Sequence, residues 1–283
     1  MVIGIIPNIT RDKGLSITKA VLHALAEQGI VANVSTDIAR QIGREDLACE
    51  ESELCSKAEL LIAIGGDGTI LNTVQKSISS QVPILGINSG RLGFLAELES
   101  KDIRKYLTKE RLLNAKVEER MVLSVTVTDE EGNENSFYVL NEVSLIRSHT
   151  SRITEIETCI NNRVNDLYPA DGILVATPTG STAYNLSAGG PIVMPYAKNF
   201  ILTPICPHTI YSRTIVLAQT DVVGIRIMGA ESLSLCVDGE AKMSVNKQYI
   251  IEVKEAPYVV KLLRLTDLDF FETLRKKIVE RGR

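Results

Sequence analysis

Apolar and polar positions follow two different rhythms along this chain of 283 residues. In about the first 115 residues, short apolar runs typical of buried parallel strands alternate with segments whose apolar residues recur at helical spacing. Ile17, Val21 and Leu25 mark one helical face, and Gly29 follows as a residue that commonly ends a helix. This rhythm predicts a parallel sheet with covering helices. The expected strands are Val2–Ile6, Ile30–Ser35, Glu59–Ile64 and Val82–Ile87, and the expected helices are Ser16–Gly29 and Thr69–Ser77.

After about Lys116 the apolar runs are short, β-branched and separated by turn residues, a pattern typical of a β-sandwich. Asp129–Asn133 has the composition of a hairpin turn, and helical spacing returns over Asp269–Arg281. We therefore expect an α/β domain over residues 1–115, an all-β domain over 116–255 and a final segment over 256–283. The expected strands are Val122–Thr128, Phe137–Ile146, Ile153–Ile160, Ile173–Ala176, Ile215–Ala218, Val222–Met228, Ser232–Val237, Tyr249–Val253 and Val259–Leu265.

Composition and charge narrow the class of protein. Apolar residues make up 45% and charged residues 23%, as in ordinary globular proteins, and the net charge of −4 provides no basic excess for nucleic acid or anionic membranes. The longest charge-free run, residues 172–197, holds four glycines and three prolines and is no membrane span. Five scattered cysteines without a CxxC pair indicate reduced thiols in a cytoplasmic protein, and three histidines exclude a His-rich metal cluster.

The sharpest local motif is Gly65-Gly66-Asp67-Gly68-Thr69, between a predicted strand and a predicted helix. Glycines let the backbone approach a ligand closely, and free N–H groups at a helix start favour phosphate. Phosphate repels a neighbouring carboxylate. The presence of Asp67 therefore indicates either a cation between the two or a chemical role for Asp67, such as general base beside a phosphate donor. A tight turn capped by Asp67 is the structural alternative. The motif is neither a Walker A loop nor a GxGxxG fingerprint.

Two further segments carry candidate binding groups. The first is Asp171-Gly172 and the hydroxyl-rich stretch Thr177–Pro191, in which Tyr184 offers a flat face for a base. A loop with local hydroxyl turns is its structural alternative. Serine-nucleophile chemistry is not favoured because no GxSxG elbow is present, although His208 stays open as a partner in space. The second is Asn141-Glu142 inside an apolar run; one of the two side chains should face inward and need a partner, such as a ligand, unless a strand end exposes both to water.

Taken together, these motifs resemble the NAD kinase family. The matching segments are Gly65–Thr69, Gly86–Phe94, Asn141-Glu142, Asp171–Pro191 and Thr203–His208, which occur in family order across most of the chain. The resemblance implies ATP-dependent phosphorylation of the 2′-hydroxyl of the adenosine ribose of NAD, giving NADP. It also implies a Rossmann-like N-terminal domain, a C-terminal β-sandwich, a last segment that packs back on the first domain, and a homodimer or homotetramer.

The resemblance assigns roles residue by residue. Asp67 matches the family's proton acceptor, and Mg²⁺ or another divalent cation would accompany ATP, with no metal site assigned to the protein itself. The matched nucleotide contacts are Gly65, Gly66, Gly68, Thr69, Phe94, Asn141, Glu142, Arg152, Asp171, Thr182, Ala183, Tyr184 and Ser187. Pro169 departs from the arginine that many relatives carry there, and Glu240 stands where several relatives have glutamine.

Two other functions remain open at this point. A lipid kinase of the diacylglycerol type shares the GGDGT turn and a β-sandwich, but no amphipathic membrane-facing segment stands out. A non-catalytic NAD(P) sensor on the same scaffold has no need for the Asp67 carboxylate. The basic residues near the end of the chain are expected to complement a helix dipole and not to bind nucleic acid.

Overall fold

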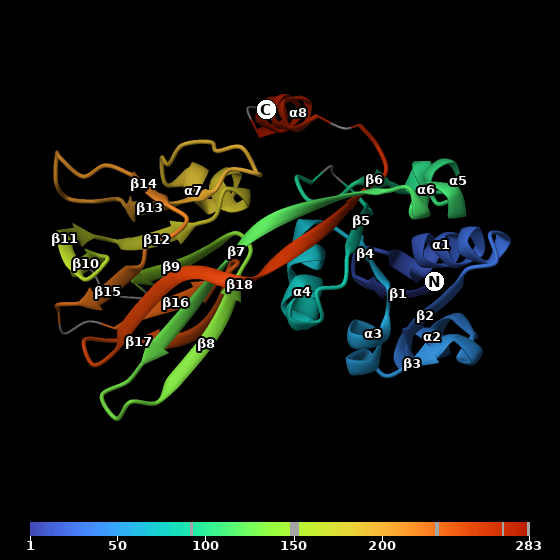
Figure 1. The fold of residues 1–283 in the computed structure, drawn as a ribbon, viewed down its shortest axis with the longest axis horizontal. Helices are drawn as coiled ribbons and strands as arrows, with labels where there is room; N and C mark the ends of the chain where they lie inside the picture. Colours follow the sequence, from blue (N-terminus) through green and yellow to red (C-terminus); the bar gives the residue numbers. More distant parts are fainter. Residues whose placement is uncertain (91–92, 148–152, 230–231, 268, 282–283) are drawn as a thin grey trace. The chain divides into compact units, whose positions relative to one another are not determined.

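The computed structural model describes residues 1–90, 93–147, 153–229, 232–267 and 269–281 (Figure 1). They fall into two compact units, one of Met1–Glu119 with Val260–Arg283 and one of Arg120–Val259. The chain passes from the first unit to the second within strand β7 (Lys116–Thr128) and returns within β18 (Ile250–Arg264). The predicted class, an N-terminal α/β domain followed by an all-β domain, is confirmed.

The first unit is built on a parallel sheet with the order β3-β2-β1-β4-β5 and a short β6 beside β5. Its central strands are apolar on both faces, as expected for a sheet covered on each side. The strands are β1 (Val2–Pro7), β2 (Val31–Ser35), β3 (Ala48–Cys49), β4 (Leu60–Gly65), β5 (Ile84–Asn88) and β6 (Leu98–Glu99), and Leu262 of β18 also pairs with β5. The helices are α1 (Ser16–Glu27), α2 (Thr36–Ile42), α3 (Glu51–Lys57), α4 (Asp67–Ser77), α5 (Ile103–Tyr106), α6 (Lys109–Leu113) and α8 (Phe270–Arg281).

Alternating residues of these strands face different helices. Ile3, Ile5 and Ile62 join one core with Val21 and Leu25 of α1. On the other face, a Cβ on Gly4 would lie 3.0 Å from Leu54 of α3, and a Cβ on Gly86 would lie 2.5 Å from Ile70 of α4. Those glycines let α3 and α4 approach the sheet closely. Figure 1 shows α1 and α4 on opposite sides of the strands.

The second unit is a sandwich of antiparallel strands. One sheet has the order β14-β13-β12-β9-β16-β17, and the other joins β11, β10, β15 and β18, with β7 paired to β18 and β8. Phe200 and Val175 of the first sheet and Ile156, Tyr168 and Ile225 of the second share one apolar core. The strands are β8 (Glu134–Val139), β9 (Glu142–Arg147), β10 (Thr154–Ile160), β11 (Arg163–Ala170), β12 (Gly172–Ala176), β13 (Asn199–Ile205), β14 (Ile215–Ala218), β15 (Val223–Ile227), β16 (Leu233–Val237) and β17 (Glu240–Val245).

The outer face of β12 and β13 is also covered. Leu174 and Ile201 point away from the sandwich core and pack against Tyr184, Ala188 and Val193. The covering segment contains a 3-10 helix (Thr179–Thr182) and the short helix α7 (Tyr184–Ser187). The hydroxyl-rich stretch is therefore a packed layer of the domain.

Several sequence expectations are wrong in detail. Phe137–Ile146 is not one strand, because the chain turns a corner at Leu140-Asn141 between β8 and β9. The two strands expected over Tyr249–Val253 and Val259–Leu265 are one strand, β18, which continues through the exposed Pro257. Strands β11, β13 and β17 were not expected. Within the described ranges, no helix is long and apolar enough to cross a membrane.

Candidate functional site

The glycine turn joins β4 to α4 in the first unit. Gly66 precedes the first helical residue, Asp67, so the helix begins two residues earlier than the sequence predicts. A Cβ on Gly65 would lie 2.1 Å from Thr69 Oγ1, which leaves room for no larger residue. The Thr69 hydroxyl accepts hydrogen bonds from the Gly66 N–H at 3.4 Å and from Asn8 Nδ2 at 3.3 Å. These contacts tie the turn to the end of β1.

The Asp67 side chain does not cap its own helix. Its carboxylate oxygens accept hydrogen bonds from the backbone N–H groups of Phe94 at 2.9 Å and Leu95 at 3.1 Å. Gly93 makes this approach possible, because a Cβ there would lie 1.9 Å from Asp67 Oδ1. The carboxylate is half-buried. Since each carboxylate oxygen can accept two hydrogen bonds, Asp67 keeps acceptor capacity toward solvent or a ligand.

The surroundings of the turn suit an anionic ligand. Backbone N–H groups at the N-terminus of a helix such as α4 attract phosphate, and Gly68 is exposed with open space where a Cβ would stand. The Arg11 guanidinium lies beside the turn, with Nη1 3.1 Å from the position of a Cβ on Gly66. Sequence reasoning missed Arg11, which lies far from the motif in the sequence. The half-buried Phe94 ring lies 6.4 Å from the ring of Phe270 in α8.

The second group of candidates surrounds the corner at Asn141 in the other unit. The Asp238 carboxylate accepts the N–H groups of Leu140 at 3.1 Å and Asn141 at 2.7 Å, and the Asp238 N–H donates to the Glu142 carbonyl. The Asn141 carbonyl in turn accepts the Thr177 N–H at 2.9 Å. Asp238 thus fixes the corner, a role that the local sequence around Asn141 does not reveal.

Glu142 is the inward-facing member of the Asn141-Glu142 pair. It is 5% exposed, and Oε2 has no hydrogen-bond partner among the described residues. Burial, and to a smaller extent the charge of Asp238, raise the pKa of Glu142 to about 7, against the opposing effect of a hydrogen bond from the Tyr184 backbone. Near neutral pH this carboxyl exists in both protonation states. It can therefore donate or accept one hydrogen bond to a ligand.

The hydroxyl-rich loop is fastened to this corner. A Cβ on Gly180 would lie 2.1 Å from the Asn141 carbonyl oxygen, so only glycine allows the contact. Asn185 is fully buried and donates to the carbonyls of Ser181 at 3.2 Å and Pro191 at 3.0 Å. Its Oδ1 accepts the Thr203 hydroxyl at 2.7 Å. Asn185, which was not among the expected site residues, is thus the residue that shapes the loop.

The remaining candidates differ in exposure. Thr182 is buried, Ala183 and Tyr184 are half-buried, and Ser187 is exposed. Burial raises the pKa of the Tyr184 phenol, with smaller contributions from the nearby charges of Glu142 and Asp171 and from two cysteines. Glu142 and Asp171 therefore lie close enough to Tyr184 to influence its pKa electrostatically.

Asp171 and the two departures from the family pattern also have defined contacts. Asp171 pairs with Arg147, Oδ1 to Nη2, at 3.2 Å. The Pro169 carbonyl accepts the N–H of the exposed His208 at 2.8 Å. Glu240 is exposed and pairs with Lys242 at 2.9 Å. The predicted contact Arg152 lies outside the described residues.

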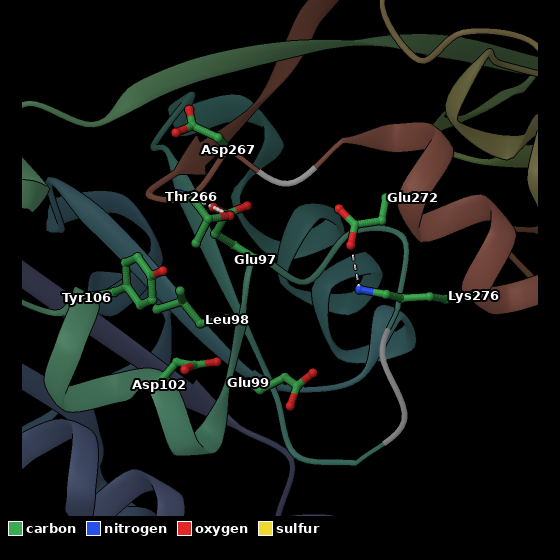
Figure 2. A pocket seen from close by; sticks show the side chains of 9 residues that line it. All are labelled: Glu97, Leu98, Glu99, Asp102, Tyr106, Thr266, Asp267, Glu272 and Lys276. Carbon is green, nitrogen blue, oxygen red and sulfur yellow. Dashed lines mark hydrogen bonds and ion pairs between the residues drawn. The ribbon is translucent and has the colours of Figure 1, made fainter.

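A hollow of about 300 Å³ lies elsewhere in the first unit (Figure 2). Its lining contains none of the candidates above and five acidic residues against one lysine, which repels phosphate. The lining residues are Glu97, Leu98, Glu99, Asp102, Tyr106, Thr266, Asp267, Glu272 and Lys276. The Asp67 turn is therefore the better candidate for a phosphate-bearing ligand.

Comparison with known proteins finds relatives that match nearly the whole chain. Residues 3–117 match the model of the ATP-NAD kinase N-terminal domain, and residues 140–265 match that of the C-terminal domain. An NAD kinase of Caldanaerobacter subterraneus is 39% identical over 99% of both chains, and one of Acetivibrio thermocellus is 38% identical over 99% of this chain and 98% of its own.

A solved structure of yeast NADH kinase complexed with NADH is similar with a TM-score of 0.90 and 26% identity, over 97% of this chain and 86% of that one. An Archaeoglobus fulgidus NAD kinase in complex with ATP shares the fold, with a TM-score of 0.76 and 24% identity over 98% of each chain. The sequence resemblance is thereby confirmed. From its motifs, its fold and these matches over nearly its full length, the chain belongs to the NAD kinase family.

Proposed function

We propose that this protein transfers the γ-phosphoryl group of ATP to the 2′-hydroxyl of the adenosine ribose of NAD, giving NADP and ADP. The observation that carries the proposal is the carboxylate of Asp67, the first residue of α4, which the backbone N–H groups of Phe94 and Leu95 hold in place. A relative with this fold was solved with NADH, which supports a dinucleotide as the acceptor.

Asp67 acts as the proton acceptor. The ribose oxygen attacks the γ-phosphorus while its proton passes to the Asp67 carboxylate, and the bond from the γ-phosphorus to the bridging oxygen breaks to release ADP. The N–H donors of Phe94 and Leu95 fix the direction of the carboxylate and leave lone pairs for the ribose proton. A fixed acceptor lowers the entropic cost of reaching the transition state.

The other candidates bind the two nucleotides. Gly65, Gly66, Gly68 and Thr69 offer the turn and the α4 N–H groups to phosphate oxygens, and the Arg11 charge supports them.

We assign the second group of candidates to the dinucleotide. Phe94 provides an apolar wall, Asn141 and Glu142 hold the adenosine side, and Asp171 contacts the nicotinamide end. The loop residues Thr182, Ala183, Tyr184 and Ser187 wrap the dinucleotide.

A divalent cation such as Mg²⁺ enters with the triphosphate. Within the described ranges, no group of three His, Cys, Asp or Glu side chains is placed to hold a metal ion. Mg²⁺ usually keeps several waters and is bound largely through substrate phosphates. When bound, the cation neutralises charge on the transferred group.

We also propose that the protein works in the cytoplasm as a homodimer or homotetramer. The five cysteines are free thiols, as expected in a reducing compartment. Size-exclusion chromatography with light scattering tests the assembly, and a mass corresponding to a single chain would contradict it.

The function is tested by incubating the protein with Mg-ATP and NAD and reading NADP with an NADP-specific dehydrogenase. Asp67→Asn should lower kcat by about 10²–10⁴-fold and still bind NAD, because the amide cannot accept the proton as a base. Asp46→Asn is the matched control, since Asp46 is an exposed residue paired only with Arg44 among the described contacts. A variant at Asp67 that turns over at the wild-type rate excludes the proposed base.

The alternatives give different results in the same assay. No NADP from the wild type, with NAD still bound, indicates a sensor. Phosphorylation of diacylglycerol instead of NAD indicates a lipid kinase.

A further inference from the structure

Glu97 is a buried carboxylate in the first unit that the proposed chemistry does not use. Its side chain is 1% exposed. Oε1 accepts hydrogen bonds from the Leu265 N–H at 2.8 Å, the Thr266 N–H at 2.6 Å and the Thr266 hydroxyl at 2.7 Å. Oε2 accepts from Arg264 Nη1 at 3.0 Å. Figure 2 shows Glu97 directed at Thr266, at the wall of the acidic hollow.

Arg264 connects Glu97 to a second carboxylate. Its Nε donates to Glu118 Oε2 at 2.6 Å, at the beginning of β7, while Nη1 serves Glu97. Burying a carboxylate is costly unless charge and hydrogen bonds compensate it, and here one cation and three further donors do so. The end of β18 and the beginning of β7 are thus fastened to Glu97 by charge-assisted bonds.

The position of Glu97 along the chain gives these bonds a further consequence. Three residues before it, Phe94 donates its N–H to Asp67, and two residues before it, Leu95 does the same. Between them and Glu97 lies the buried Ala96, and the Glu97 N–H donates to the Gly86 carbonyl at 2.9 Å. The segment that holds Asp67 is therefore fixed at its far end by Glu97.

We propose that Glu97 is a positioning residue that holds the 93–97 segment so that its N–H groups orient the Asp67 carboxylate. The inference rests on the proposed role of Asp67 as proton acceptor. Replacing Glu97 by glutamine keeps an oxygen for Leu265 and Thr266 but turns an NH₂ group toward the Arg264 guanidinium. Two donors then face each other, and the anchor of the segment is lost.

A neighbouring glutamate provides a matched control. Glu99 lies two residues after Glu97, in β6, is half-exposed, and pairs only with Lys101 on the surface among the described contacts, at 2.6 Å. Glu99→Gln removes the same charge by the same chemistry at a position just outside the 93–97 segment. It does not touch the donors of Glu97.

The experiment measures steady-state kinetics and amide hydrogen exchange on the full-length protein. For Glu97→Gln we expect kcat to fall about tenfold, with KM for NAD and ATP within about twofold, because the substrates still bind while the proton acceptor is misdirected. Hydrogen exchange at the Phe94 and Leu95 amides should become about tenfold faster, since the released segment no longer keeps these amides in hydrogen-bonding geometry with the Asp67 carboxylate. Glu99→Gln should match the wild type in both measurements.

Three results overturn the proposal: an unchanged kcat, a loss of kcat without faster exchange at these two amides, or the same loss in Glu99→Gln. If Glu97→Gln does not fold, Arg264→Lys provides the test. A lysine ammonium lacks the separate Nε and Nη1 donors with which the guanidinium binds Glu118 and Glu97. This variant should show faster exchange at both amides, and unchanged exchange contradicts the inference. Amide exchange is measured without substrate. If the wild type makes no NADP, the proposed function is refuted. The exchange rates of the Phe94 and Leu95 amides still show whether Glu97 holds the segment.

Discussion

Each unit contains one candidate carboxylate, and the two are held in opposite ways. Asp67 is half-buried and receives two backbone N–H groups. Glu142 is buried beside another carboxylate, and its Oε2 has no partner among the described residues. The first arrangement holds the carboxylate in one direction, whereas the second gives a carboxyl whose pKa is raised to about 7.

This difference in environment suits one carboxylate to proton transfer and the other to contact with a ligand. A proton acceptor must be correctly directed before the reaction, which the two N–H donors achieve. A ligand contact can carry an unsatisfied oxygen because the ligand supplies the missing partner. The local environment, and not the presence of a carboxylate, separates the two roles.

Among the substitutions that test this comparison, filling the space beside the Asp67 carboxylate should have the largest effect. In Gly93→Ala the new Cβ would stand 1.9 Å from Asp67 Oδ1, so the carboxylate or the segment must move. A displacement of this kind should lower kcat about 10²-fold. Gly224→Ala is the control, since its Cβ would make an ordinary contact at 3.6 Å from Cys159. Wild-type kcat in Gly93→Ala would show that Asp67 needs no exact placement.

A smaller effect should appear at Glu142 and depend on pH. The pKa of Glu142 is raised to about 7 in the folded protein from an ordinary value of 4.5, so the folded state favours the protonated carboxyl. The free energy of unfolding therefore decreases as pH rises from the unfolded to the folded pKa. Glu142→Gln should stabilise the protein by about 2 kcal/mol at pH 8 and by much less at pH 4.5. Urea unfolding at the two pH values measures the gain.

The contrary outcome for Glu142 is equally definite. A Glu142→Gln gain that does not change with pH would mean that the carboxyl is not the titrating group. Glu142→Gln should also raise KM for NAD, since the neutral amide cannot carry the carboxylate charge or accept hydrogen bonds at both of its ends.

The smallest effect should come from a third carboxylate, Glu240. It is exposed and pairs with Lys242 at 2.9 Å, and surface pairs of this kind contribute little. Glu240→Gln should change the free energy of unfolding by less than about 0.5 kcal/mol at either pH. A pH-dependent gain as large as that of Glu142→Gln would remove the distinction between buried and exposed carboxylates. Thermal and urea unfolding check this value.

The sequence alone predicted those features that depend on residues close together in the chain. The parallel strands and the helices α1 and α4 follow from local apolar spacing, and the glycine turn follows from its motif. It did not find the corner at Asn141, because the residue that holds it, Asp238, is 97 positions away. Nor did it find Arg11, whose place beside Gly66 depends on the fold of β1 against β4.

Two of the missed strands lacked the usual sequence signal. β11 and β17 are largely exposed, so they lack the apolar runs that identify a buried strand. Pro257 and its charged neighbours made β18 look like two strands, although an exposed proline is compatible with a continuing strand. Asn185 was seen as one polar residue among many, because its importance comes from burial and three hydrogen bonds that only the folded chain makes.

The packed layer over β12 and β13 has a consequence for how a ligand arrives. Lifting the loop would expose Leu174, Ala176, Ile201 and Ile205 to water and break the bonds of Asn185. The loop is therefore unsuited to swing as a lid, and its binding groups are in place before the dinucleotide comes. Little conformational entropy of the loop is lost when the ligand binds there. The association rate is therefore limited by diffusional encounter and not by ordering of the loop.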